Sequence, residues 1–530
     1  MCGFAVAIGV PQADVVVDRL IQGILHRGDV TDPIVSPRRE MAMGTRRLRI
    51  VDGERAMQPQ TSSDGRLVVS FNGEIYNHCE LRRELAAFGV RFRTESDTEV
   101  LANALQVWGE AALTRFIGMY AFVAVDTQSG EFLAARDPFG VKPLYLIQND
   151  DGLCFCSEIR PLLQTVETGD VMLLPPGYAL SPTKCAPFAS PVAAQEARTE
   201  NCVHTLDRLL SEAVRRRLPS GLPVAAMFSG GIDSTLVAHY MRRFRPEAPG
   251  YFVGNVNGPD YRFAEEYADR TGFDLRRISF DPGSEETGTL LEQAVTVSES
   301  FEPNLIRGAV CSLMVAERMH RDGFRVALCG EGADELFCGY PPLELAFHGG
   351  NDEGRPIRAE CLDLMHRVSL QRVDRCSMRF QLEAREPFLD PSVANYALGL
   401  DSTALVREVN GLPRGKAPLR EIFDLYPDEL PAAIRDRAKV PFGAGAGLGA
   451  GKDSAWKNRF EQAISDGDLR DGQEEFAAFS VRSKEELFYL RKLAQAMDVY
   501  RVPHLQARAW ISFSMDRYVD RLAAYAHHSL

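Results

Sequence analysis

The sequence predicts two domains of different class, an α+β domain rich in short strands and an α/β domain with a parallel sheet and many helices. Three observations support this. Short β-rich segments dominate the first 190 residues. A stretch rich in Pro, Ala, Ser and Gln covers residues 184–201 and resembles a linker. Beyond it, helical patterns alternate with single short strands, which is typical of a parallel sheet. We expect domains at 2–183 and 202–530.

The elements of the first domain follow from apolar patterning. Leu67–Phe71 is apolar and β-branched, and the Asn72-Gly73 dipeptide after it favours a turn. The turn residues at 127–130 predict a hairpin between two apolar runs. The remaining predictions are hairpin strands at 120–125 and 131–136, and helices over 80–88 and 98–108, where apolar residues recur at i, i+3 and i+4.

The second domain begins with a helical pattern over Val203–Arg217. Short apolar segments then predict parallel strands at 224–228, 251–256 and 326–329. Residues Gly443–Gly451 alternate mainly glycine with alanine. Because glycine opposes helix formation, we expect a mobile loop there.

Composition narrows the classes of molecule that the protein could bind. The 530 residues carry 60 Lys and Arg against 73 Asp and Glu, a net charge of −13, whereas nucleic acids and anionic membranes call for a basic face. The eleven cysteines lack zinc-site spacing and fit a reducing compartment. Without an 18-residue apolar run or a signal-peptide pattern, we expect a cytoplasmic protein with small-molecule partners. A homodimer is also considered.

Cys2 follows the initiator methionine, and removal of that methionine would leave a thiol and a free α-amine on one residue. An α-amine with a pKa near 8 can serve as the base for its own thiol. The alternative is that Cys2 is only a small apolar residue opening a buried strand. The surrounding sequence favours the nucleophile.

Three other segments offer groups that a thiol nucleophile needs. Asn72 and Gly73 can direct an amide and a backbone N–H at an oxyanion. Arg47 can hold a substrate carboxylate, and Asp97 a substrate ammonium. Each alone has a simpler explanation, namely a turn, a surface charge and a helix cap.

Together these residues resemble the class II glutamine amidotransferases, which have an N-terminal-nucleophile αββα fold. Further matches are His26-Arg-Gly28, Gly118–Phe122 and Arg136–Tyr145. The resemblance implies that Cys2 forms a glutamyl thioester and releases ammonia, with an oxyanion site at Asn72 and Gly73 and glutamine-binding residues Arg47, Asn72, Glu74 and Asp97. One departure is Asp29-Val-Thr-Asp-Pro33, where the family continues with Pro-Asp.

A second motif, Ser229-Gly-Gly-Ile-Asp-Ser-Thr235, lies between a predicted strand and a helical pattern. Its glycines allow backbone N–H groups to approach phosphate oxygens, and the helix dipole adds attraction. No Walker A sequence occurs in the chain. The motif resembles the pyrophosphate loop of enzymes that cleave ATP to AMP and pyrophosphate. Asp233 is then a candidate Mg²⁺ ligand. The alternative is a simple strand-to-helix turn.

A third cluster, Cys329–Tyr340, also follows a predicted strand, where ligands of α/β domains gather. Glu331 lies between two glycines, so its carboxylate and the adjacent backbone can reach a ligand. Asp334 can join Asp233 at a metal ion. Alone, this segment would be only an acidic turn.

With the Cys2 domain, these motifs resemble the glutamine-dependent asparagine synthetases. The match continues through 299–307, 383–390, 416–421 and 483–491. The resemblance implies ATP and Mg²⁺ as cofactors, catalytic roles for Glu331 and Lys439, and magnesium on Asp233 and Asp334. It places Lys439 on a mobile glycine-rich loop, where its charge could stabilise the transition state. The implied ATP-binding residues are Met227, Ser229, Gly230, Gly231, Asp233, Ser234, Val253, Cys329 and Gly330.

The implied reaction is amidation of a carboxylate through its acyl-adenylate, with aspartate as the default acceptor and Arg307 as a candidate clamp for the acceptor carboxylate. Cys329, Cys338, Glu386 and Ala444 depart from the family pattern. They keep a second hypothesis open, namely that the same machinery amidates a different acid. A third hypothesis is a glutaminase-only or non-catalytic relative.

Overall fold

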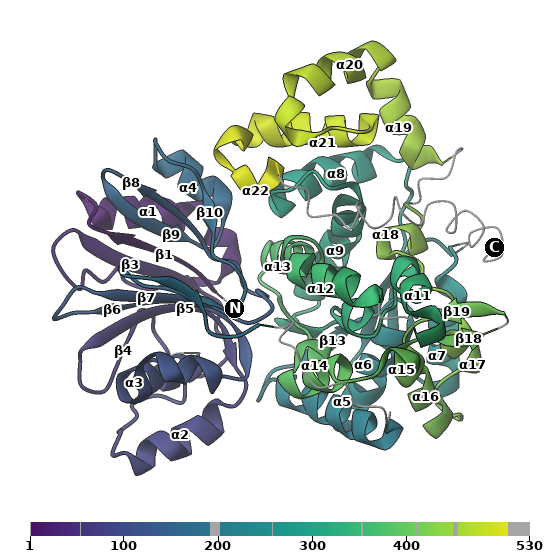
Figure 1. Cartoon of the computed structure of the whole chain (residues 1–530), viewed down its shortest axis with the longest axis horizontal. Coiled ribbons are helices and arrows are strands. Elements are labelled where there is room, and N and C mark those ends of the chain that lie inside the picture. Colours follow the sequence, from purple (N-terminus) through teal and green to yellow (C-terminus); the bar gives the residue numbers. More distant parts are fainter. Residues whose placement is uncertain are drawn as a thin grey trace.

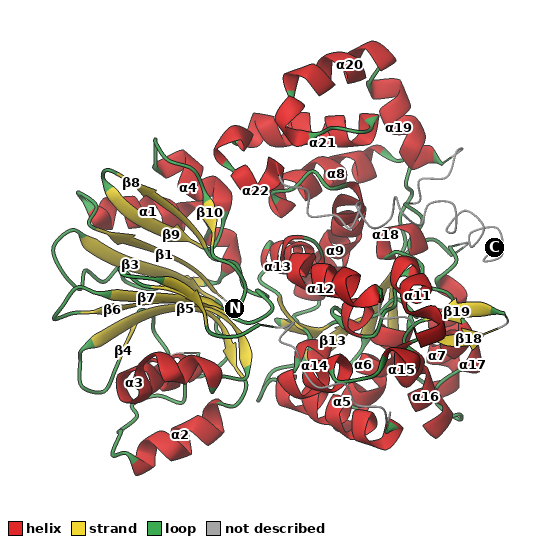
Figure 2. Ribbon diagram, in the orientation of Figure 1, coloured by secondary structure: helices red, strands yellow, loops and turns green. Residues whose placement is uncertain are grey.

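The computed structural model describes residues 2–53, 55–190, 202–256, 258–350, 353–409, 411–448 and 454–506. Two bodies lie side by side, a strand-rich one built from the first part of the chain and a larger helix-rich one (Figures 1 and 2). No helix among the described residues is long and apolar enough to cross a membrane.

Two six-stranded sheets make up the first domain. Their orders are β10-β8-β9-β1-β3-β2 and β12-β11-β7-β6-β5-β4. The first sheet comprises β1 Cys2–Ile8, β2 Val30–Thr31, β3 Met41–Arg47, β8 Tyr145–Asn149, β9 Gly152–Cys156 and β10 Met172–Leu173. The second comprises β4 Gln60–Thr61, β5 Leu67–Ile75, β6 Gly118–Asp126, β7 Phe132–Arg136, β11 Tyr178–Leu180 and β12 Cys185–Pro187.

The two sheets pack face to face and helices cover their outer faces. Phe4 and Val6 of one sheet share an apolar cluster with Val68 and Val123 of the other. Helices α1 Ala13–Gly23 and α4 Ile159–Thr165 pack with the first sheet, and α2 His78–Ala87 and α3 Asp97–Trp108 with the second. These layers confirm the predicted αββα fold and both predicted helices.

The turn predicted at Asn72-Gly73 is wrong. Both residues lie inside β5, which pairs with β6 over its whole length, so that Asn72 faces Ala121 and Gly73 faces Tyr120. A Cβ on Gly73 would come within 2.1 Å of Met119 O. The glycine therefore permits close approach of two strands instead of turning the chain.

The expected linker is also shorter than its composition indicates. Cys185–Pro187 forms β12 and pairs with β11 at the edge of the second sheet. Backbone pairing overrides the weak strand propensity of this segment. Residues 191–201 of the expected linker lie outside the described residues.

The second domain has a five-stranded parallel sheet with the order β15-β14-β13-β16-β17. Its strands are β13 Val224–Met227, β14 Gly250–Val253, β15 Leu275–Ile278, β16 Val326–Leu328 and β17 Glu383–Arg385, and a separate hairpin joins β18 Arg407–Val409 to β19 Leu412–Arg414. The predicted strands are present, but β15 and β17 escaped prediction because each is short and charged.

Helices cover both faces of this sheet. Val224 and Ala226 pack with α5–α7, whereas Ala225, between them, packs with α8 and α9, as the alternation of a strand requires. The helices are α5 Val203–Arg217, α6 Ile232–Phe244, α7 Tyr261–Thr271, α8 Glu285–Ser298, α9 Pro303–Arg321, α10 Ala333–Leu336, α11 Pro341–Phe347, α12 Gly354–Leu364, α13 Ser369–Met378, α14 Pro391–Leu398, α15 Ser402–Leu405, α16 Ala417–Leu425, α17 Ala432–Asp436, α18 Phe442–Gly445, α19 Ala455–Ala463, α20 Asp466–Glu475, α21 Lys484–Ala496 and α22 Pro503–Gln506.

The glycine-rich segment differs from the expected loop. Its first residues form the single helical turn α18, and Gly443 and Gly445 are buried. A Cβ on Gly443 would come within 2.8 Å of Arg307 Cβ, and one on Gly445 within 1.9 Å of Asp260 Oδ2. The glycines thus allow close packing. Residues 449–453 lie outside the described residues.

Buried ion pairs join the two domains. Arg27 of the first domain donates two 3.0 Å hydrogen bonds to the carboxylate of Asp374 in α13. Arg375 of the same helix donates across the interface to Ser157 O at 2.9 Å and pairs with Glu299 of its own domain at 3.0 Å. Because these side chains are almost fully buried, the relative position of the domains is tightly specified.

Candidate active sites

The first candidate site surrounds Cys2 at the start of β1. Strand β3 runs antiparallel to β1 and sets Arg47 directly opposite Cys2. A cavity of about 360 Å³ opens beside them. Its lining brings together Cys2, Arg47, Gly73, Glu74 and Asp97, which the sequence had placed in one site. Gln58 and Glu383 also line it.

Asn72 connects the nucleophile to an oxyanion site. The backbone nitrogen of Cys2 donates to Asn72 Oδ1 at 3.1 Å. The Nδ2 atom of this fully buried side chain has no hydrogen-bond partner within the described part of the chain. A buried donor without an acceptor is costly, and an oxyanion beside the thiol would satisfy it.

The Cys2 thiol is not acidic in this setting. Burial raises the pKa of Cys2 to about 11, although the positive charge of Arg47 opposes the rise. A neutral thiol is a weak nucleophile, so it needs a base at the moment of attack. The free α-amine of a processed Cys2 is the nearest candidate for that base.

Two acidic side chains line the opposite wall. Burial, with the nearby Asp97 charge, raises the pKa of Glu74 to about 8, and burial raises that of Asp97 to about 6. Asp97 Oδ2 accepts from Ile75 N at 3.0 Å, while Ser96 caps α3. Asp97 is therefore not needed as the helix cap. An arriving ammonium group would favour the ionised form of both acids.

Arg47 already holds a carboxylate. Its Nε and Nη2 donate to the two oxygens of Asp32 at 2.6 and 3.0 Å. Asp32 belongs to the segment that departs from the family pattern after Gly28. Asp29 of the same segment bonds Arg49 and, from the second domain, Arg325 at 2.8 Å. The unusual loop thus engages Arg47 directly.

The second candidate site lies at the carboxyl end of β13 and β16. The loop after β13 leads into α6, and Ser229 N donates to Ser234 Oγ at 3.1 Å. Gly230 has φ +69°, and a Cβ there would come within 2.7 Å of Ala264 N. A glycine is needed because the backbone is left-handed and touches α7. The resulting turn leaves N–H groups at the start of α6 for a phosphate.

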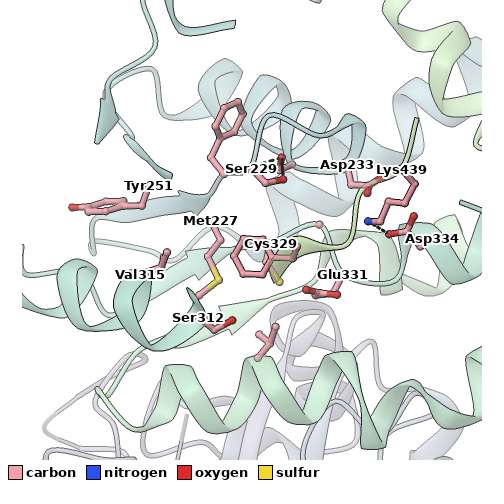
Figure 3. Close-up of a pocket in the computed structure, with 15 residues that line it drawn as sticks. Met227, Ser229, Asp233, Tyr251, Ser312, Val315, Cys329, Glu331, Asp334 and Lys439 are labelled. Atoms are coloured by element: carbon pink, nitrogen blue, oxygen red, sulfur yellow. Dashed lines mark hydrogen bonds and ion pairs between the residues drawn. The ribbon is translucent and has the colours of Figure 1, made fainter. Parts of the chain in front are cut away.

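Two aspartates and two lysines converge at the mouth of this loop. Figure 3 shows three of them, Asp233, Asp334 and Lys439. Lys416 Nζ lies 2.6 Å from Asp233 Oδ2 and 2.5 Å from Asp334 Oδ1, and Lys439 bonds Asp334 Oδ2. Burial opposes ionisation of Asp334, yet Lys416 and Lys439 lower its pKa to about 2. Burial raises the pKa of Asp233, with Lys416 acting against the rise.

The carboxylate pair fits a magnesium ion. The carboxylates of Asp233 and Asp334 both contact the ammonium group of Lys416. Asp233 Oδ1 is buried without a hydrogen-bond partner in the described structure. Mg²⁺ is commonly held by one or two carboxylates together with substrate phosphates. No group of three or more acidic, His or Cys side chains suited to a metal occurs among the described residues.

A cavity of about 660 Å³ extends from this loop along the sheet edge. Its lining includes Met227, Ser229, Asp233, Ser234, Cys329, Gly330, Glu331, Asp334 and Lys439, all expected from the sequence. Figure 3 shows Glu331 and Cys329 on the side of the cavity away from Ser229. Arg372 of α13 forms an ion pair with Glu331.

Some expected residues lie elsewhere. Gly231 lines a neighbouring cavity, whereas Gly230 and Val253 line neither. Val253 packs in the core between the sheet and α9. Arg307 does not line the main cavity and is paired with Glu485 of α21, its Nε donating to Oε1 at 2.9 Å. The structure therefore does not bring Arg307 together with the other candidate residues.

Sequence reasoning missed several residues that complete the two sites. Lys416 has φ +60° just before α16, and only its position in the Lys416–Glu421 match pointed toward it. Arg437 donates to Gly230 O at 2.8 Å. Glu383 and Arg385 of β17 reach the Cys2 cavity from the other domain, with Arg385 Nη2 donating to Glu74 Oε2 at 3.0 Å.

Comparison with known proteins matches both halves of the chain. Residues 1–173 match the family described as glutamine amidotransferase domain, and residues 205–360 and 355–513 match the family described as asparagine synthase. Asparagine synthetase [glutamine-hydrolyzing] 2 of rice is 30% identical over 84% of this chain and 78% of its own length. Similar relatives are asparagine synthetase [glutamine-hydrolyzing] of Triphysaria versicolor (30%, 88% and 79%) and asparagine synthetase [glutamine-hydrolyzing] 1 of Arabidopsis thaliana (31%, 79% and 74%).

Proposed function

The chain belongs to the family of glutamine-hydrolysing asparagine synthetases, and from this premise we propose that it converts aspartate to asparagine with ATP and ammonia taken from glutamine. The observation that carries the proposal is the presence of two distinct candidate sites in one chain. One surrounds a thiol beside an unsatisfied amide donor. The other combines a phosphate loop with two convergent carboxylates.

In the glutaminase half, Cys2 Sγ attacks the side-chain carboxamide carbon of glutamine while the α-amine of Cys2 takes the thiol proton. Asn72 Nδ2 and the Gly73 N–H stabilise the negative oxygen of the tetrahedral intermediate. The C–N bond then breaks, the amine returns the proton, and ammonia leaves with a glutamyl thioester behind it. Water hydrolyses the thioester to glutamate. The unpartnered Nδ2 atom supports this role for Asn72.

Glutamine is held at its other end. We assign its α-ammonium to Glu74 and Asp97, whose raised pKa values would return toward normal beside a cation. Its α-carboxylate is assigned to Arg47. Because Asp32 already bonds Arg47, binding requires either a shared or a displaced Asp32.

In the synthetase half, the Ser229–Ser234 loop binds ATP phosphates, with Met227 and Cys329 beside the base. Asp233 and Asp334 would hold Mg²⁺, which offsets phosphate charge when bound. A carboxylate oxygen of aspartate attacks the α-phosphorus, and the bond to the β-phosphate oxygen breaks to release pyrophosphate. Lys439, which lines the cavity as a permanent cation, stabilises charge on the phosphorus.

Ammonia then attacks the acyl carbon of the adenylate, a proton is lost, and AMP leaves. We assign Glu331 to the attack step because its carboxylate lines the cavity with Cys329. Its pairing with Arg372 fixes the position of the carboxylate. Val253 and Arg307 remain predictions for nucleotide and acceptor binding.

The decisive experiment supplies the protein with glutamine, ATP, Mg²⁺ and a panel of carboxylic acids. We expect amidation of aspartate only, with AMP and pyrophosphate as products. Amidation of another acid would support the second hypothesis, which is based on departures from the family pattern such as Cys329 and Glu386. Formation of ADP and phosphate, or no amide with any acid, would contradict the proposal.

We also assign the enzyme to the reducing cytoplasm. All eleven cysteines have free thiols, and eight of them are buried, which suits a compartment where thiols stay reduced. The homodimer considered from the sequence stays a prediction.

A further inference from the structure

The cavity around Cys2 is completed by the synthetase domain. Glu383 lines that cavity, although it belongs to β17, the edge strand of the parallel sheet. Its side chain is fully buried. Arg385, two residues later on the same face of the strand, donates to Glu74 in the cavity wall. A strand of one domain therefore supplies a carboxylate to the active site of the other.

Glu383 carries its negative charge throughout the neutral pH range. Burial opposes ionisation, but Arg385 lowers the pKa of Glu383 to about 2. The Nε atom of Arg385 donates to Glu383 Oε1 at 2.5 Å. Arg385 already pairs with this carboxylate, and the mature cavity contains one further candidate cation that could share it.

That candidate is the amino terminus of processed Cys2. The Cys2 nitrogen already donates to Asn72 Oδ1. Removal of Met1 converts this amide into an ammonium group with three donors, of which Asn72 accepts one. We propose that Glu383 is a positioning residue of the glutaminase, contributed by the synthetase domain, which pairs with the α-ammonium of Cys2 and holds it against Asn72. This inference rests on the proposed function.

The electrostatic direction follows from the charges around Cys2. A nearby carboxylate stabilises the ammonium form, so the amine becomes a free base only at higher pH. The same charge disfavours the thiolate of Cys2. The charged groups around Cys2 and Glu383 are Arg27 of the segment after α1, Arg47 of β3, Glu74 of β5, Asp97 of α3, Lys142 after β7 and Arg385 of β17.

Glu383→Gln keeps the shape of the side chain and removes its charge. We expect the acidic limb of the kcat/KM profile for glutamine hydrolysis to move down by about one pH unit or more, since an adjacent opposite charge shifts a pKa by about that amount. We also expect the plateau to fall, because the amine is no longer fixed. Glu383→Asp keeps the charge but shortens the reach, so the plateau should fall while the limb stays close to wild type.

Glu386→Gln is the matched control. Glu386 follows three residues after Glu383, is equally buried at 3% exposure, and contacts Cys329 Sγ instead of lining the Cys2 cavity. This variant should leave the acidic limb of glutamine hydrolysis in place. Synthesis of asparagine from added ammonium, measured for every variant, reports whether the synthetase domain is folded.

The outcomes distinguish failure of this inference from failure of the proposed function. A glutaminase plateau that falls in Glu383→Gln with an unmoved acidic limb would overturn the inference, because a purely structural role gives that result. A limb that moves equally in Glu386→Gln would also overturn it. If the wild-type protein hydrolyses no glutamine at any pH, the proposed function itself fails.

Discussion

Asn72 and Cys2 illustrate how little of the glutaminase chemistry resides in the thiol alone. The thiol has a pKa of about 11 because it is buried, so its reactivity depends on a base and on an oxyanion donor. The Cys2 nitrogen is the candidate base, and Asn72 Nδ2 is the candidate oxyanion donor. A hydrogen bond from Cys2 N to Asn72 Oδ1 joins the two residues. The nucleophile and its support therefore form one unit.

Cys2→Ala should abolish glutamine-dependent synthesis and leave ammonium-dependent synthesis intact, because the synthetase site contains no part of the thiol chemistry. Glutamate and asparagine are quantified with either nitrogen source. Cys79→Ala changes an exposed thiol that lines neither cavity, so it is the control and should behave as wild type. Residual glutamine hydrolysis in Cys2→Ala would exclude Cys2 as the nucleophile.

Lys439 is expected to act on the transition state. Burial opposes its charge, but Asp334 and Asp233 raise its pKa, so it is a cation at any working pH. Lys439→Ala should slow adenylate formation by about 10²–10³-fold, the usual effect of removing one preorganised group, with little change in ATP affinity. Lys439→Arg should not restore the rate, because a planar fork differs from a compact ammonium.

Single-turnover pyrophosphate release and direct ATP binding distinguish these effects. Lys492→Ala, which removes a surface lysine paired with Glu292, serves as the control. Equal losses of ATP affinity and rate in Lys439→Ala would make Lys439 a ground-state ligand.

At the residue level, local motifs were enough to predict which residues gather around the two cavities. Cys2, Asp233 and Glu331 line a cavity and Asn72 accepts from Cys2 N, and each of them lies in a short pattern with a physical meaning. Lys416 and Glu383 were not assigned. Their roles depend on contacts with residues far away in the chain, and no local pattern encodes such a contact.

Among the elements, the phosphate loop depends most strictly on one backbone geometry. Gly230→Ala should reduce ATP-dependent synthesis about tenfold or more, since a left-handed alanine costs about 1–2 kcal/mol and its Cβ would also clash with Ala264 N. Glutamine hydrolysis should remain. Gly221→Ala is a matched control with φ +73° and no atom within 4 Å, so it adds the strain without the clash.

Pyrophosphate release and thermal denaturation are measured for both variants. If Gly221→Ala impaired synthesis as much as Gly230→Ala, loss of stability and not loop geometry would be the cause.

Elements also show where local patterns mislead. Asn72-Gly73 is a strong turn dipeptide, yet β5 continues through it because its pairing with β6 extends over the whole strand. The glycine-rich segment was expected to be mobile, yet Gly443 and Gly445 fit against Arg307 and Asp260. In both cases tertiary contacts outweigh intrinsic propensity.

For the whole molecule, the buried pair between Arg27 and Asp374 should determine how tightly the two reactions are coupled. Arg27 also donates to Cys2 O at 3.2 Å, so it connects the nucleophile to α13. Asp374→Asn removes one of the two carboxylates that pair with Arg27, Glu158 being the other, and breaking a buried pair costs up to about 3–5 kcal/mol. The ratio of glutamate formed to asparagine formed should then rise above one.

Asp390→Asn is the control, because Asp390 is equally buried but pairs with Arg217 inside the second domain. It should lower thermal stability and leave the product ratio at one. An unchanged ratio in Asp374→Asn would show that this pair has no part in coupling.

The interface pair also predicts a pH dependence. Burial opposes the charge of Asp374, but Arg27 and Lys142 hold its pKa below the ordinary value. A lowered pKa in the folded state contributes stability above the unfolded-state pKa, and this stability is lost as pH falls through the lowered value. The product ratio of the wild type should therefore be constant near neutrality and rise only in acid.

The wall that β17 gives to the Cys2 cavity has a consequence during protein synthesis. Domains fold in order as the chain leaves the ribosome, and β17 follows the first domain by roughly 190 residues, or about 10–40 s of translation. Throughout that interval the newly synthesised first domain lacks Glu383, Arg385 and Asp374. If Glu383 positions the amine as proposed, the thiol is made first but its site is completed last, and a nascent chain should hydrolyse little glutamine before its synthetase domain can use the ammonia.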